Sequence, residues 1–251
     1  MIEIVSSCWR YDRCLAYHLS ALALDPPPVP VRCTIYWAAE DGPTAAVLAK
    51  FRQIKEPNIA WDFRLIPRTQ LMRRAISRND AAKRTEADWL IFTDVDYCYT
   101  GTAIGELAEE LREADDWTLW FTRNIMTNTQ EDGDLLIEAV TNRNKTPFIS
   151  VSRDPYAWAL TLPPEYFEPA TLPRAIGGSQ IISGRLARKV GYLPNHEKYQ
   201  RPSETWRRTF EDRAFRSWLS EAHNVGQGRL KCGKVARIRH TKRGRFDECR
   251  N

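Results

Sequence analysis

The first half of the chain alternates short apolar runs with longer amphipathic segments, and this alternation limits the folds open to it. Strand patterns cover 2–7, 31–39, 59–66, 88–95 and 117–123, and helix patterns cover 14–24, 43–54, 69–85 and 102–116. Repeated strand–helix units predict βαβ connections and a mainly parallel sheet flanked by helices. A continuous apolar run such as "WLIF" at 89–92 is typical of parallel strands buried on both faces.

The composition allows a single large domain. The 251 residues are 43% hydrophobic, and no linker-like stretch divides them. We therefore expect one domain over 1–251, with a nucleotide-binding half at 1–100 and an acceptor and catalytic half at 101–251. The net charge of +5 suits a ligand that carries phosphate, although an ordinary basic protein has the same balance.

The cysteines and the apolar stretches narrow the class of protein further. The six cysteines include no CxxC pair, so they suggest neither a zinc framework nor a dense disulfide pattern. The N-terminus lacks the features of a signal peptide, and no apolar stretch approaches the ~20 residues that cross a bilayer. The expectation from sequence is a cytoplasmic protein without a transmembrane segment.

The strand pattern at 88–95 is followed at once by acidic residues, in the stretch "DWLIFTDVDYCYT". Ligands of open α/β sheets bind beyond the carboxyl ends of the strands. If the strand continues through Asp94 and Asp96, both side chains point to the same side. Two adjacent carboxylates are typical of a site where a divalent cation meets a phosphate. A second D-x-D, at Asp132 and Asp134, reads as a solvated loop.

Further motifs follow in a fixed order along the chain. They are "RRAISRND" before the acidic strand, then "AIGGSQIISGRLARKVGYLP", "FEDRAFRSWL" and "ARIRH". This ordered set, over about residues 2–243, resembles the GT-A glycosyltransferases, both the family-2-like enzymes and the catalytic region of β-1,4-galactosyltransferase-like proteins. The resemblance implies a Rossmann-like nucleotide-sugar-binding domain. It also implies a hexosyltransferase-type activity that is metal-dependent and inverting, with UDP-sugar as the expected donor.

The resemblance also implies roles for residues at the donor. Asp94 and Asp96 match the family's acidic motif, which binds the ribose-diphosphate and a divalent metal, Mn²⁺ or Mg²⁺. His240 of "IRH" matches a histidine that also ligates the metal, and Arg237 stands where galactosyltransferase-type sites have a methionine. The backbone at Gly177 and Gly178 corresponds to a segment close to the donor sugar.

The remaining implied roles concern the base, the diphosphate and the chemistry. Asp41 in "AAEDGPT" corresponds to the acidic turn that faces the nucleotide base. The arginines placed to meet base or diphosphate are Arg10, Arg74 and Arg78. Glu211 and Asp212 match the catalytic carboxylate pair, with Asp212 as the base that takes the acceptor proton and Glu211 orienting the acceptor. Acids at a helix start are also favoured by the helix dipole alone.

Two other functions are compatible with the same residues. A nucleotidyltransferase also joins a nucleotide-binding sheet to metal-binding acids, although "SSCWRYDR" lacks the expected glycine-rich loop. The second alternative function is a non-catalytic module with the same fold that binds a sugar or a nucleic acid. The acceptor stays open between a saccharide, a protein and a modified nucleic acid. The basic, aromatic segment 195–209 is predicted to be a loop that closes over the bound donor.

Overall fold

The main structural feature is a seven-stranded sheet with the strand order β10-β6-β9-β4-β1-β2-β3. The computed structural model describes residues 1–141, 160–205 and 209–241. The strands of this sheet are β1 (Ile2–Ser7), β2 (Val31–Trp37), β3 (Ile59–Leu65), β4 (Trp89–Phe92), β6 (Thr118–Thr122), β9 (Gln180–Ser183) and β10 (Gly226–Leu230). Neighbours pair in parallel except around β9, which runs antiparallel to both β4 and β6. The predicted α/β class with a mainly parallel central sheet is confirmed.

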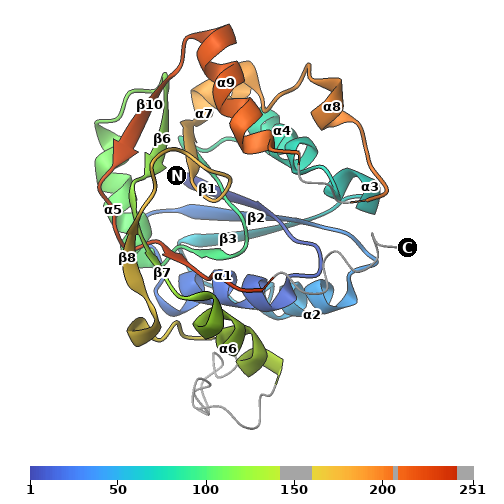
Figure 1. Ribbon diagram of the computed structural model, residues 1–251, viewed down its shortest axis with the longest axis vertical. Coiled ribbons are helices and arrows are strands. Elements are labelled where there is room, and N and C mark those ends of the chain that lie inside the picture. The colour runs from blue at the N-terminus through green and yellow to red at the C-terminus, as the bar shows by residue number, and fades with distance from the viewer. Residues whose placement is uncertain (142–159, 206–208, 242–251) are drawn as a thin grey trace.

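Helices cover both faces of this sheet (Figure 1). On one face lie α1 (Asp12–Leu24) and α2 (Gly42–Phe51), and on the other lie α4 (Arg74–Arg84), α7 (Gly184–Val190) and α9 (Glu211–His223). Because both faces are covered, the central strands are buried almost throughout: Ile4, Val5, Leu90, Ile91 and Phe92 have no exposed surface. This buried centre fixes the carboxyl ends of β1 and β4, which is where a ligand site is expected.

A second, four-stranded sheet lies beside the first in the order β5-β11-β7-β8. Its strands are β5 (Tyr97–Cys98), β7 (Asn124–Thr127), β8 (Glu168–Thr171) and β11 (Ala236–Arg237). Strand β11 pairs antiparallel with β5, with Arg237 opposite Tyr97. The small sheet therefore carries the "ARIRH" segment to the residues that directly follow Asp96.

The remaining helices show where local sequence determines a helix start. Helix α5 (Gly101–Arg112) begins after Thr100, whose side chain accepts a hydrogen bond from the Ala103 amide, and Ser183 caps α7 in the same way. The other elements are α3 (Arg68–Leu71), α6 (Gln130–Thr141), the 3₁₀ helix η1 (Pro164–Tyr166) and α8 (Glu197–Gln200). None of the helices in the described part of the chain is both long and apolar enough to cross a bilayer.

Two expectations from sequence were wrong, and a third is tested only in part. The single helix expected over 69–85 is divided into α3 and α4, because Arg73 adopts an extended conformation between them. Asp132 and Asp134 lie in helix α6 rather than in a loop, and Asp134 accepts a hydrogen bond from the Thr241 amide at 2.6 Å. Segment 195–209 is a loop apart from the short helix α8 in the ranges that the structure describes, residues 206–208 lie outside those ranges, and its closure over a donor stays a prediction.

A buried histidine lies beneath the start of the small sheet and makes the fold sensitive to pH. His18 of α1 is fully buried, and its Nδ1 donates a hydrogen bond of 2.5 Å to the Tyr97 carbonyl. Burial lowers the pKa of His18 from 6.5 to about 4. The folded protein therefore keeps this ring neutral in a pH range where the unfolded chain takes up a proton.

From this shift we predict a loss of stability in mild acid. Because the unfolded state binds more protons between the two pKa values, the His18 contribution to the free energy of unfolding falls by about 2 kcal/mol between pH 7 and pH 5. Urea unfolding of the wild type and of His18→Gln, whose amide can still donate to the carbonyl, measures the difference. The variant should lose less stability over this range by that amount, and an equal loss in both proteins would contradict the prediction.

Candidate active site

Asp94 lies at the carboxyl end of β4 and is tied to helix α4. Strand β4 ends at Phe92, and the Tyr97 amide donates to the Asp94 carbonyl at 3.0 Å, which closes a tight turn. The Asp94 carboxylate accepts from Arg74 Nη1 at 2.5 Å and from Arg78 Nη2 at 3.4 Å. The negative charge of Asp94 raises the pKa of Arg74.

Asp96, two residues later, faces the small sheet instead. Its Oδ2 lies 3.7 Å from Nε of Arg237, and its backbone carbonyl accepts from the Ile238 amide at 2.8 Å. The expectation that strand alternation places both acids on one side is therefore wrong, because 94–97 form a turn rather than extended strand. The two carboxylates have different partners, one on α4 and one on β11.

His240 follows β11 by three residues and has a nitrogen available as a ligand. Its Nδ1 donates to the Thr241 carbonyl at 3.2 Å, and its ring meets Tyr11 edge-on at 5.1 Å. Its Nε2 is buried and has no hydrogen-bond partner among the described residues. A neutral histidine that donates through Nδ1 presents the lone pair of Nε2, which is the form that binds metals.

The donor set suits a divalent cation that shares its ligands with phosphate. Asp96 supplies hard carboxylate oxygens and His240 an imidazole nitrogen, both of which bind Mn²⁺. In the described ranges, however, no three His, Cys, Asp or Glu side chains are grouped closely enough to hold a metal ion by themselves. The protein fits such an ion when other ligands, such as the oxygens of a diphosphate, complete its coordination.

Gly177 lies where the strand-end acid and the acidic helix start come together. A Cβ at this residue would lie 3.3 Å from Oδ2 of Asp94, 3.5 Å from Nη1 of Arg74 and 3.8 Å from Cβ of Asp212. A Cβ on the adjacent Gly178 would instead lie 1.9 Å from the Tyr97 ring, so that glycine is required for packing. A side chain at residue 177 would therefore crowd the Asp94 carboxylate and Arg74, so glycine suits this buried position.

The two acids that open α9 differ in exposure. Glu211 is buried, with Oε1 accepting from the Thr209 hydroxyl at 2.8 Å and Oε2 lying 3.7 Å from Nε of Arg74. Asp212 is about a quarter exposed, and its Oδ2 lies 3.7 Å from Nη1 of Arg216. Asp212 is therefore the acid of the pair that a substrate can reach, whereas Glu211 contacts the protein.

Arg78 is buried inside the site and contacts protein on every side. Its side chain is 2% exposed and donates to the Gly177 carbonyl at 2.7 Å and to the Tyr192 hydroxyl at 3.0 Å. It also donates to Oε1 of Gln180 at 3.3 Å, and Nε2 of Gln180 donates in turn to the Asp212 carbonyl at 3.2 Å. Arg78 thus links the strand-end acid, the glycine segment and the start of α9.

Asp41 and Arg10 lie at the carboxyl ends of β2 and β1. Asp41 is buried and caps α2: it accepts from the amide of Thr44 at 3.3 Å, from the Thr44 hydroxyl at 2.7 Å and from the Arg10 amide at 2.5 Å. These three bonds give Asp41 a structural role in fixing both turns. The Arg10 side chain is exposed and lies over the Trp9 ring at 5.4 Å.

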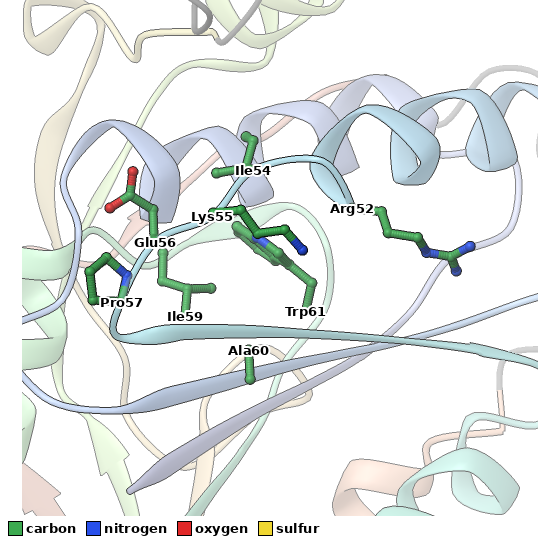
Figure 2. A pocket seen from close by; sticks show the side chains of 8 residues that line it. All are labelled: Arg52, Ile54, Lys55, Glu56, Pro57, Ile59, Ala60 and Trp61. Carbon is green, nitrogen blue, oxygen red and sulfur yellow. The ribbon is translucent and has the colours of Figure 1, made fainter.

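A separate cavity of about 460 Å³ lies at the other end of the sheet (Figure 2). It is lined by residues between the end of α2 and the start of β3, among them Arg52, Lys55 and Trp61. Because it opens at the amino end of β3, it is not part of the site formed at the carboxyl ends of β1 and β4.

Sequence reasoning missed Gln180, Tyr192, Thr209 and Arg216. Gln180 is fully buried in β9, and its amide bonds both Arg78 and the Asp212 carbonyl. A polar residue beside the apolar pair Ile181–Ile182 is the one signal for it, since a buried amide needs partners. Arg216 donates to the Ala175 carbonyl, and this link between α9 and the glycine segment depends on tertiary structure that the sequence pattern does not show.

Comparison with known proteins gives one family match and several solved structures of similar fold. The family described as "Glycosyl transferase family 2" matches residues 37–156, and no curated protein matches the chain. The mannosyltransferase PcManGT from Pyrobaculum calidifontis, solved with GDP-Man and Mn²⁺, matches with a TM-score of 0.56 at 12% identity over 98% of this chain and 58% of that one. TarS from S. aureus matches with a TM-score of 0.58 at 11% identity over 94% of this chain and 36% of that one.

A further solved structure, S. aureus TarS 1-349 in complex with UDP, matches with a TM-score of 0.54 at 12% identity over 98% of this chain and 62% of that one. The chain thus spans 36% to 62% of the lengths of these three structures. At such low identities these likenesses concern the fold, and the family match over 37–156 adds the class of enzyme. The chain is therefore similar to the family-2 glycosyltransferases over residues 37–156 and shares the fold of these solved glycosyltransferase structures.

Proposed function

We propose that this chain is a metal-dependent, inverting glycosyltransferase that moves a sugar from a nucleotide diphosphate donor, with UDP-sugar as the expected donor, to a hydroxyl acceptor. One observation carries the proposal: the space beside Gly177 adjoins both Asp94 and Asp212. The side chains of a donor acid and of the candidate base thus lie next to the same glycine. Similar folds solved with GDP-Man and Mn²⁺ and with UDP support a sugar-nucleotide donor.

The chemistry follows from what each side chain can do there. Asp212 takes the proton from the acceptor hydroxyl while that oxygen attacks the anomeric carbon from the face opposite the diphosphate, so the configuration inverts. Arg74 orients Asp94 toward the ribose side of the donor, and Asp96 with His240 would hold the metal. When bound, a divalent ion neutralises the diphosphate and makes it a better leaving group.

In this proposal, three residues that the family resemblance suggests for the site hold other groups in place and do not contact the substrate. Arg78 fixes the Gly177 carbonyl and, through Gln180, the backbone of Asp212. Glu211 orients Arg74 at 3.7 Å rather than touching the acceptor. Asp41 fixes the Arg10 amide, and the exposed Arg10 side chain is the nearby group that a nucleotide can meet.

The proposal predicts that nucleotide and metal bind together. Because no described cluster supplies three ligands, Mn²⁺ alone should bind weakly, and UDP should bind at least about tenfold more tightly with Mn²⁺ than after EDTA, a difference of about 1.4 kcal/mol. Isothermal titration calorimetry of UDP measures both, and Asp96→Ala should remove the effect of Mn²⁺.

The second D-x-D provides the matched control. Asp132→Asn removes the same kind of charge from α6, where Asp132 accepts a hydrogen bond from Thr129 at 2.6 Å. This variant should keep the wild-type response to Mn²⁺. Equal UDP affinity with and without Mn²⁺, or an unchanged effect of Mn²⁺ on UDP affinity in Asp96→Ala, would contradict the proposed role of the metal.

A further inference from the structure

Strand β3 forms an open edge of the large sheet. It is the last strand in the order of that sheet, and its inner side pairs with β2 over the whole of 59–65. No residue in the described ranges bonds to the backbone on its outer side. An open edge presents unpaired amides and carbonyls to which a further strand can add, and natural proteins commonly shorten, charge or cover such edges.

Three residues in the interior of β3 direct their backbone groups outward. The carbonyl of Asn58 and the amide of Ile66 both bond to the backbone of β2, at 2.7 and 3.0 Å. The even-numbered residues between them face β2 in the same way, because the direction of the amide and carbonyl alternates along a strand. The outward-facing residues inside the strand are therefore Trp61, Phe63 and Leu65.

The neighbouring residues limit this outward stretch at both ends. The amide of Ile59 already donates to the carbonyl of Glu56 at 3.1 Å, and Pro67 has no amide hydrogen to offer. The stretch 61–65 is thus symmetric about Phe63. A second copy can pair with it antiparallel about a two-fold axis at Phe63, and this pairing uses every outward amide and carbonyl of 61–65 in both copies.

The same pairing brings opposite charges together. Nε of Arg64 lies 2.8 Å from Oδ2 of Asp62, and these side chains are 37% and 26% exposed. In a pairing about Phe63, Asp62 of each copy lies opposite Arg64 of the other. Both are non-hydrogen-bonded pairs, in which opposing side chains approach most closely. A pairing about Trp61 would instead place Ala60 opposite Asp62 and lose both charge contacts.

Apolar side chains on the other face of β3 favour the same arrangement. The Trp61 ring contacts Phe51 of α2 at 5.6 Å and Phe63 at 6.1 Å. Leu65 is 57% exposed, more than any other large hydrophobic side chain that the structure describes. Pairing about Phe63 places Leu65 of each copy opposite Trp61 of the other, and cross-strand contacts between aromatic and aliphatic side chains stabilise a sheet.

We propose that the chain forms a symmetric dimer in which two β3 edges pair antiparallel and join the two large sheets into one. The same patch serves on both copies, as in the two-fold dimers that are commonest among soluble oligomers. Because the two β3 strands run in opposite directions, the two candidate active sites lie at opposite ends of the joined sheet. The interface uses none of their residues, so the inference does not depend on the proposed function.

The test measures dimerisation of charge-reversed variants by sedimentation velocity over a wide range of protein concentration. Circular dichroism first shows that each variant is folded. The wild type should show a monomer–dimer equilibrium. Asp62→Arg and Arg64→Asp each turn two attractive cross-strand pairs into repulsive ones, so each should raise the dimer Kd at least about tenfold. An equimolar mixture of these variants restores opposite charges at every pair and should form a heterodimer.

Arg112→Asp is the matched control, because it reverses an exposed charge on helix α5. It should dimerise like the wild type. Leu65→Pro removes an outward amide at the edge and should also weaken the dimer.

A wild type that stays monomeric at every concentration would overturn the inference, as would Arg64→Asp dimerising as well as Arg112→Asp. A mixture of Asp62→Arg and Arg64→Asp without heterodimer would overturn it too. If the edge receives a strand of another protein instead of a second copy, the first of these results is expected.

Discussion

Replacing Asp212 with asparagine should lower the rate of donor turnover by about 100-fold or more, because the amide cannot accept the proton that the attacking hydroxyl must lose. The substitution keeps the shape of the side chain, and the backbone carbonyl of residue 212 can still accept from Gln180. UDP affinity should therefore stay within about twofold of the wild type. Initial rates of UDP release, with water as the acceptor where none is known, and calorimetry with UDP provide the two measurements.

Glu221→Gln is the matched control for this variant. Glu221 is an exposed acid on the same helix α9, far along from its start. Removing its charge should leave turnover unchanged. If Asp212→Asn turned over like this control, Asp212 would be only an acid that stabilises a helix N-terminus, and the base would lie elsewhere.

Replacing Arg78 with methionine should lower the free energy of unfolding by about 3–5 kcal/mol, because it leaves the groups that the buried guanidinium binds without their partner. Arg78 is 2% exposed. Its partners include the carbonyl of Gly177, the hydroxyl of Tyr192 and the carboxylate of Asp94. Urea unfolding measures the change, provided that the variant can be purified in folded form.

Two companion variants keep this prediction testable. Arg78→Lys retains the charge but cannot reach the same acceptors as the planar guanidinium, so its loss of stability should be intermediate. Arg112→Met removes an arginine whose ion pair with Glu109, at 2.7 Å, leaves both side chains 66% exposed. Such a pair should contribute less than about 1 kcal/mol. Equal losses for Arg78→Met and Arg112→Met would contradict the structural role of Arg78.

The first half of the fold could be predicted because its signals are local. Each of the strand patterns there forms a strand of the large sheet, and α2 and α5 start at residues whose side chains cap them. The strands of the four-stranded sheet, and β9 of the large sheet, could not be predicted in this way. β5, β7, β8, β9 and β11 are two to four residues long. Such short segments depend on partners that are distant in sequence.

The candidate site also combines features that local sequence indicates with contacts between segments distant in sequence. The sequence shows Asp94 and Asp96 after an apolar run, but the turn that separates their side chains depends on the Tyr97 amide and on β11. Nothing local interrupts the helix pattern at Arg73, where α3 and α4 separate. The proximity of Gly177 to both Asp94 and Asp212 joins three distant segments. Resemblance to a family can indicate that arrangement, whereas spacing alone cannot.

The most direct test of the central claim is release of nucleotide from a panel of UDP- and GDP-sugars, with and without Mn²⁺ and without added acceptor. We expect at least one sugar nucleotide to be hydrolysed, with a rate that needs the metal and that falls to background in Asp96→Ala. A protein that binds UDP but releases nucleotide from no donor in the panel would contradict the proposal and indicate a non-catalytic binding module on the same fold.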